Sequence, residues 1–249
     1  MLFIHFKTLF SFRFYHRLAQ LRLLPVIGFV VYLFLLSTLV LFFFTGSFVK
    51  NNLPVFLKNF PQITFENGVL TQPQQPVSAP VPHTDYKIVF DAAANTPPSA
   101  EKLIEEHILA WVHRNQLYMP SVSGLQTQDL PKNLNFTSDT QTIEKYTPAL
   151  TVSLRVALFL TAVLLLLLFL VFDYCMALGV LFFFSALKRV LLPKTVLLKW
   201  AAFLLGPLSV LFFVHLWITV PLFTFAQLIV CIIYAQQIFN TLPEIPHEN

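Results

Sequence analysis

Three ionisable side chains, Arg155, Asp173 and His215, lie inside or at the edge of long apolar stretches. A charged side chain at the centre of a bilayer costs about 2.5–3.5 kcal/mol on insertion scales, so such residues often mark ion or proton routes. Asp173 is the main candidate, because a buried carboxylate there would pair with His215 or with a membrane amide. The interfacial alternatives place Arg155 among the outer headgroups, His215 beside an outer turn and Asp173 at the inner interface.

A second group of candidates lies in the polar segment between the first two apolar stretches. Glu66 and Asn67 stand at a predicted turn, and Asp91 ends a predicted strand; we expect these residues to form a surface that binds a partner or ligand. His107 and His113 are six residues apart, whereas helical metal sites use a spacing of four. With no nucleophile elbow or Gly-rich phosphate loop, the sequence predicts no catalytic, cofactor-binding or metal site, and no enzyme.

The composition restricts the class of protein. The chain has 249 residues, of which 56% are hydrophobic and 11% charged, against about 25% charged in a typical soluble domain. A simple soluble enzyme, a disordered protein and a nucleic-acid binder are therefore excluded. The two cysteines, Cys175 and Cys231, both lie in apolar runs, so the sequence contains neither a disulfide framework nor a cysteine-based zinc site.

Apolar and basic stretches alternate along the chain and predict a membrane topology. Residues 1–24 carry four basic and no acidic side chains, and residues 25–45 are uncharged and long enough to cross a bilayer. We interpret this pair as a cytoplasmic segment and an uncleaved signal anchor. An apolar stretch at 148–187 is followed by a basic cytoplasmic loop at 188–195. Two further spans are predicted at 196–216 and 222–239, joined by a turn at 217–221, and the chain is expected to end in a cytoplasmic tail at 240–249.

The stretch 148–187 has two interpretations. It forms either one long helix, or two helices with a tight turn at Asp173. The first gives four spans and the second five. Four spans place the basic clusters at 1–24 and 188–199 on the same, cytoplasmic side, as the positive-inside tendency requires, so we favour four.

Residues 46–147 have ordinary polarity, with seven basic and nine acidic side chains, and predict a small α+β extracytoplasmic domain between spans one and two. Strands are expected at 62–70, turning at Asn67-Gly68, and at 86–91. Weaker strand candidates lie at 117–119 and 125–130. Ser99 is expected to cap a helix that runs to about His113. The Pro- and Gln-rich residues 72–82 predict an extended flexible arm without packing.

Several short phrases along the chain occur in a recognisable order. They are a Phe- and Lys-rich start at 6–16, the phrase PQITFENGVL at 61–70, the strand IVFD at 88–91, the triplet LYM at 117–119 and the late spans. This order resembles a bacterial family known as domain of unknown function 1189. The arm at 72–82 and the scarcity of Gly in the spans depart from the pattern. The resemblance implies a protein of the bacterial inner or cytoplasmic membrane with no assigned activity, and it carries over no functional residues. Together with the topology, it leads us to expect a multi-pass protein of the bacterial cytoplasmic membrane with its N-terminus in the cytoplasm.

These observations favour a non-enzymatic accessory or sensory membrane protein whose extracytoplasmic domain binds a partner or ligand. The expected partners are the lipid bilayer and a membrane or envelope protein, with no nucleic acid and no cofactor. The alternative is a small transporter or permease component that uses the intramembrane carboxylate of Asp173. A membrane-embedded enzyme acting on lipid or cell-wall precursors would need clustered polar groups at the outer interface, where only Arg155 and His215 are available.

Overall fold

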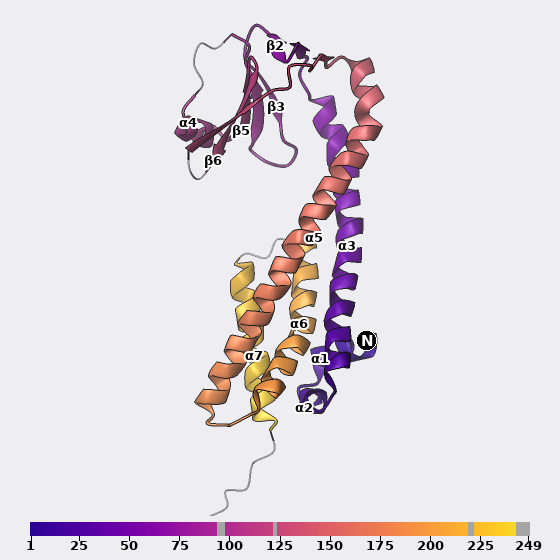
Figure 1. The fold of residues 1–249 in the computed structure, drawn as a ribbon, viewed down its shortest axis with the longest axis vertical. Helices are drawn as coiled ribbons and strands as arrows, with labels where there is room; N and C mark the ends of the chain where they lie inside the picture. Colours follow the sequence, from indigo (N-terminus) through magenta and orange to yellow (C-terminus); the bar gives the residue numbers. More distant parts are fainter. Residues whose placement is uncertain (94–97, 122–123, 219–221, 243–249) are drawn as a thin grey trace, which may run out of the picture. The chain divides into compact units, whose positions relative to one another are not determined.

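The computed structural model describes residues 1–93, 98–121, 124–218 and 222–242 (Figure 1). The chain divides into two compact units. The helical unit contains Met1–Thr45 and Ala157–Asn249, and the domain contains Gly46–Val156. Both divisions fall inside long helices, because α3 (Leu23–Lys58) and α5 (Thr140–Leu187) each contribute residues to both units. Each unit is described separately below.

Four helices within the described part of the chain are long and apolar enough to cross a membrane. They are α3, α5, α6 (Lys194–Trp217) and α7 (Phe223–Asn240). The stretch predicted at 148–187 belongs to one continuous helix, so the alternative of a helix pair with a turn at Asp173 is wrong. Of the predicted turn at 217–221, residues 219–221 lie outside the described residues, as do 243–249 of the predicted tail.

The two helices α3 and α5 extend beyond their predicted apolar limits. Helix α3 continues past Thr45 to Lys58, and α5 begins at Thr140, before the predicted start of its apolar stretch. Hydropathy marks where a segment leaves an apolar environment, whereas helix ends depend on capping and packing. The domain predicted at 46–147 therefore begins and ends in helix.

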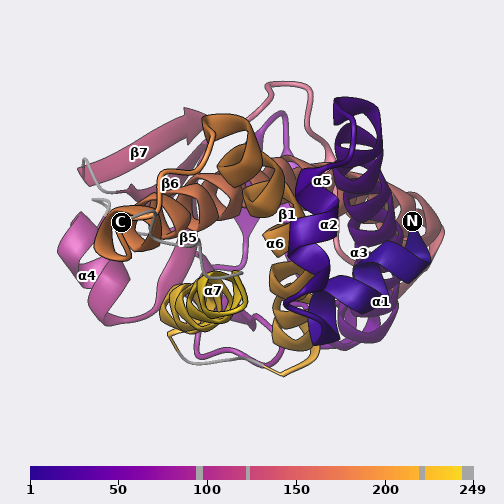
Figure 2. The same cartoon turned by 90° about the horizontal axis from the view of Figure 1, so that it is seen from below.

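The helical unit has a core centred on α6. Helices α1 (Leu2–Phe10) and α2 (Phe14–Ala19) both contact α6, α2 near Trp200 and α1 near Gly206; Figure 2 shows these helices from below. The indole Nε1 of Trp200 on α6 donates to the Tyr15 carbonyl at 2.8 Å. The N-terminal segment, predicted from the sequence as a basic cytoplasmic segment, therefore packs on the helical unit. Its helix α1 buries His5 and Thr8 while Phe3 and other large apolar side chains remain exposed.

The described residues of the domain form two sheets. The five-stranded sheet has the order β3-β4-β5-β6-β7, and the three-stranded sheet has the order β2-β1-β8. Among the described strands, only β4 and β5 pair in parallel, and the connection between them contains α4 (Ala100–Glu105). The strands are β1 (Thr64–Glu66), β2 (Val69–Gln72), β3 (Val77–Pro80), β4 (Lys87–Phe90), β5 (Ile108–His113), β6 (Gln116–Ser121), β7 (Gly124–Asp129) and β8 (Phe136–Thr137).

The hairpin predicted at Asn67-Gly68 is present. Strands β1 and β2 pair antiparallel, and the two turn residues have φ values of 52° and 78°. Positive φ at both central positions is the property that favours Asn-Gly in a two-residue hairpin. The strands predicted at 86–91, 117–119 and 125–130 are also confirmed, as β4, β6 and β7.

Two predictions for the domain are wrong. The helix capped by Ser99 ends at Glu105, and the remaining residues up to His113 form β5. His107 has a φ of 54°, which stops the helix, and β5 is buried between β4 and β6, so tertiary pairing overrides the local helical pattern. The predicted flexible arm contains β3, in which Ala79 is fully buried. Pro80, the proline within β3, is tolerated because β3 is an edge strand.

The five-stranded sheet is covered differently on its two faces. One face packs against the three-stranded sheet through a core that includes Phe65, Leu70, Ala79, Phe90 and Val112. On the other face, α4 packs on β5 and β6 through the fully buried Leu103. A six-residue helix is too short to cover five strands. The part of this face formed by β3 and β4 therefore remains open beside α4.

Candidate functional site

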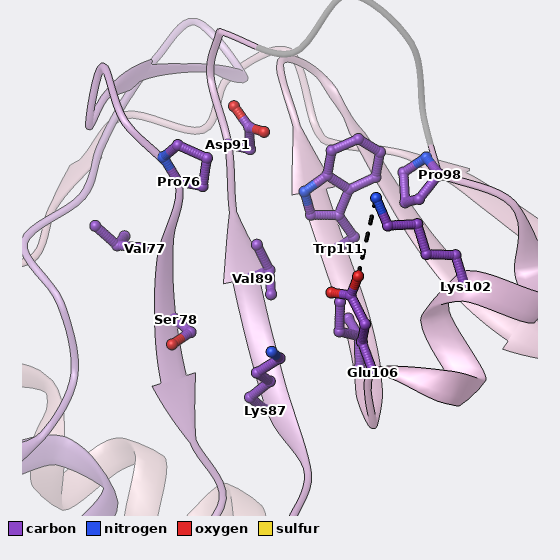
Figure 3. Close-up of a pocket in the computed structure, with 11 residues that line it drawn as sticks. Pro76, Val77, Ser78, Lys87, Val89, Asp91, Pro98, Lys102, Glu106 and Trp111 are labelled. Atoms are coloured by element: carbon purple, nitrogen blue, oxygen red, sulfur yellow. Dashed lines mark ion pairs between the residues drawn. The ribbon is translucent and has the colours of Figure 1, made fainter.

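A pocket of about 540 Å³ lies where α4 leaves β3 and β4 uncovered (Figure 3). Its volume falls in the range of about 300–1,000 Å³ that is typical of small-molecule sites. Charged, hydroxyl, aromatic and apolar side chains all contribute to its walls. The lining residues are Pro76, Val77, Ser78, Lys87, Val89, Asp91, Pro98, Lys102, Glu106, Ile108 and Trp111.

Strand β4 and the residue after it supply the floor of the pocket. Side chains of a strand alternate between faces, so Lys87, Val89 and Asp91 point to the same side of the sheet. Ser78 joins them from the neighbouring strand β3, to which β4 is paired with Ser78 opposite Val89. Trp111 on β5, also opposite Val89, closes the floor towards α4 and is only 6% exposed.

Helix α4 supplies the opposite wall. Ser99 caps this helix, since the Ser99 Oγ accepts the Lys102 backbone N–H at 3.3 Å. The carboxylate of Glu101 accepts hydrogen bonds from the Glu101 backbone N–H and from the Ser99 side chain, and these bonds lower the pKa of Glu101. Lys102 Nζ lies 3.8 Å from Glu106 Oε1, an ion pair one helical turn apart. Both side chains are largely exposed, so this pair contributes little stability and can rearrange around a ligand.

Asp91 is held rigidly at the upper end of the pocket. Its side chain is 8% exposed, and its Oδ1 accepts the Ala93 backbone N–H at 3.0 Å. His113 Nδ1 lies 2.8 Å from the Asp91 carbonyl oxygen and donates to it. The ring of His113 stacks on Trp111 at 5.7 Å between centroids. These contacts hold the Asp91 side chain beside the indole of Trp111, and both side chains are largely shielded from water.

The predicted binding surface is divided between two places in the domain. Asp91 lines the pocket, whereas Glu66 lines a separate depression of about 450 Å³ with Lys145 and Tyr146 among its residues. The Asn67 backbone N–H donates to Asn135 Oδ1 at 2.8 Å, which pins the turn to the chain before β8. Asp91 and the Glu66–Asn67 turn therefore do not line a common pocket.

Two of the ionisable residues predicted in apolar stretches have specific neighbours. The guanidinium of Arg155 lies against Gly46 of α3, where an added Cβ would stand 2.8 Å from Nη2. The ring of His215 stacks on Phe223 with 4.2 Å between centroids, and this contact joins the end of α6 to the start of α7. His215 is not the partner that the sequence suggested for Asp173.

Asp173 is buried in the helical unit, where its side chain is 5% exposed. Gln227 on α7 is its partner: Gln227 Nε2 donates to Asp173 Oδ2 at 3.0 Å, and the Gln227 side chain is 1% exposed. Asp173 is therefore buried within the helical unit and paired with an amide, one of the two kinds of partner that the sequence suggested for it. Ala177 and Leu181, which follow Asp173 at intervals of four residues on the same face of α5, are fully buried as well.

The site residues that sequence reasoning missed are Ser78, Lys87, Lys102 and Glu106. A signal for part of the site was present, because Lys87, Val89 and Asp91 alternate in a predicted strand. The contribution of α4 carried no such signal. Across the described ranges, no group of three or more His, Cys, Asp or Glu side chains is arranged to hold a metal ion.

Four candidate membrane helices, with one α/β domain between the first and second, define the class of protein. Residues 5–238 match the family described as "Protein of unknown function (DUF1189)", and the chain belongs to this family. The match confirms the resemblance noted in the sequence. Searches among curated proteins and among solved structures gave no match.

Proposed function

We propose that this protein is a non-enzymatic accessory or sensory membrane protein whose domain binds a ligand or partner in the pocket between α4 and β4. The pocket is the observation that carries the proposal. It combines two lysines, two carboxylates and a buried indole within one small-molecule-sized cavity. No nucleophile and base are needed for such a site to act by binding alone.

The chemistry of the lining indicates what the pocket would accept. Lys87 and Lys102 offer cationic donors, while Asp91 and Glu106 offer anionic acceptors. Trp111 adds an apolar, polarisable surface. A ligand or partner segment that carries both charges and an apolar part fits this set better than a purely apolar or purely anionic one.

Charge distribution supports an extracytoplasmic position for the domain. With four spans, the basic segments at 1–24 and 188–199 share one side of the membrane and the domain, between the first two spans, occupies the other. The positive-inside tendency assigns the basic side to the cytoplasm. We therefore propose that the protein lies in a bacterial cytoplasmic membrane with its N-terminus inside, and that α3 and the later spans anchor it.

The test is co-purification in mild detergent from native membranes, followed by mass spectrometry of retained proteins and small molecules. Ser78→Arg should fill the pocket, because Ser78 is an exposed residue at its floor. Gln128→Arg is the matched control, at an exposed position on the opposite edge strand β7. A partner or ligand lost from Ser78→Arg and kept by Gln128→Arg supports the proposal; equal retention by both variants contradicts it.

The burial of Asp173 favours a second candidate function, a small transporter or permease component. Intramembrane carboxylates that face a bundle interior often belong to ion or proton routes. Asp173→Asn should then abolish transport while the protein stays at its normal level in the membrane. Normal transport by this variant would remove the candidate.

A further inference from the structure

The pair formed by Asp173 and Gln227 contains two buried oxygens without a hydrogen-bond partner. They are Asp173 Oδ1 and Gln227 Oε1, each on a side chain less than a tenth exposed. The other two polar atoms of the pair are satisfied by a single bond, from Gln227 Nε2 to Asp173 Oδ2 at 3.0 Å. Buried polar atoms are almost always paired, so two orphans in one pair require a physical explanation.

An ionised carboxylate explains this arrangement poorly. Both orphaned oxygens would then be acceptors, and neither could bond to the other. One neutral amide donor would be the only compensation for a charge buried among apolar side chains, and groups in that position usually take up a proton instead. Among the described residues, Asp173 forms no ion pair.

The titratable and basic groups of the surrounding helices are engaged elsewhere. The Tyr174 hydroxyl donates to the Leu198 carbonyl, and the Tyr234 hydroxyl donates to the Leu9 carbonyl. Lys199 on α6 donates to two backbone carbonyls at the end of α2, and His215 stacks on Phe223. Cys231, one turn beyond Gln227 on α7, is neutral as a thiol and fully buried. No neighbouring cation thus supplies a countercharge within the part of the chain described.

A single proton satisfies both orphaned atoms. A protonated carboxyl has one O–H donor, and a primary amide has one carbonyl acceptor beside its N–H donors. A proton on Oδ1 would give Asp173 a donor for Gln227 Oε1, beside the bond from Gln227 Nε2 to Oδ2. The two bonds together would form a ring between α5 and α7. We propose that Asp173 and Gln227 form an intramembrane proton-binding site.

The position of the pair suits proton exchange from one end of the helical unit. Gln227 lies four residues after the start of α7, or about 6 Å along the helix axis. At the other end, Lys188 Nζ lies 3.3 Å from Asn240 Oδ1, about 20 Å along the helices from the pair. When the proton is released to water, Asp173 Oδ1 and Gln227 Oε1 are both acceptors and cannot bond to each other. One of the two hydrogen bonds that the Asp173–Gln227 pair forms between α5 and α7 is then lost. Protonation is thereby coupled to the contact between these helices, whichever of the proposed functions holds.

The experiment is infrared spectroscopy of the full-length protein, freed of lipid in a maltoside detergent so that no ester carbonyl overlaps. At pH 7 the water-exposed carboxyl groups are ionised, so the C=O stretching band of a protonated carboxyl reports on buried carboxyl groups, and its loss in Asp173→Asn assigns it to this site. The wild-type protein should show this band, with a shift to lower frequency in D₂O. Asp173→Asn should lose it while remaining folded, because an amide–amide pair can form the same two-bond ring.

Two further samples separate the site from general effects. Gln227→Leu should move the band towards the frequency of a carboxyl without hydrogen bonds, whereas Gln236→Leu, at an exposed position on the same helix, should leave it unchanged. Aspartate labelled with ¹³C at the side-chain carboxyl should shift the band in the wild-type chain, a result that does not depend on any variant folding. Absence of the band at pH 7, or a band insensitive to the label or to Gln227→Leu, overturns the proposal.

Discussion

Leu103 connects the stability of α4 with the geometry of the pocket. Its side chain is fully buried against β5 and β6, whereas Ile104, the next residue on the same helix, is 59% exposed. Truncating a buried Leu to Ala costs about 2–5 kcal/mol through lost transfer energy and the cavity that remains. Because α4 is short and packs on only one side, it can partly collapse into the cavity, so we expect the lower part of this range, about 2–3 kcal/mol.

This loss can be measured by hydrogen exchange of the full-length protein, read by mass spectrometry on peptides from α4, β5 and β6. If these amides exchange through opening of the domain, the expected change corresponds to exchange about 30- to 140-fold faster in Leu103→Ala, since about 1.4 kcal/mol is a factor of ten. Ile104→Ala should change the rate little. Lys102 and Glu106 lose their support in the Leu103 variant, so retention of any ligand should fall too. Equal effects of the two substitutions would refute the assignment of Leu103 as the anchor of α4.

Three other perturbations test separate parts of the structure. Lys199→Met removes two charged hydrogen bonds to carbonyls at the end of α2, at 2.9 and 2.7 Å. We expect the free energy that holds α2 on α6 to fall by about 2–4 kcal/mol, so that proteolysis near α2 becomes faster. An unchanged rate of cleavage would contradict this role of Lys199. Burial lowers the pKa of His16 in the folded protein, so the unfolded chain binds more protons at this residue than the folded one. Stability should therefore fall as the pH drops below about 6.5. The thermal unfolding temperature of His16→Gln should lack this part of the pH dependence. Gly68→Ala would place a Cβ 2.5 Å from the Pro131 carbonyl oxygen at a positive φ and should lower the thermal unfolding temperature, whereas Gly179→Ala, with open space around it, should not.

Local signals in the sequence were sufficient for the existence of the four long apolar helices and for the hairpin. Residues 25–45 were recognisable as a span because they carry no charge, which would be costly in an apolar environment. The Asn67-Gly68 turn was recognisable because Asn and Gly adopt a positive φ easily. Even there, the ends of α3 were beyond prediction, because residues 46–58 are polar enough to leave an apolar environment and still remain helical.

The remaining features depend on residues far apart in the chain. Residues 108–113 have an apolar pattern that fits a helix locally, and they became β5 only because β4 and β6 pair with them on either side. The open face beside α4, and with it the pocket, follows from that pairing. Hydropathy alone placed Asp173 in an apolar stretch and left its burial undecided, whereas its pairing with Gln227, 54 residues away, required the packing of α5 on α7. Sequence patterns determine which side chains seek an apolar environment; only the tertiary structure decides which polar groups meet there, since burial and hydrogen bonding depend on non-local packing.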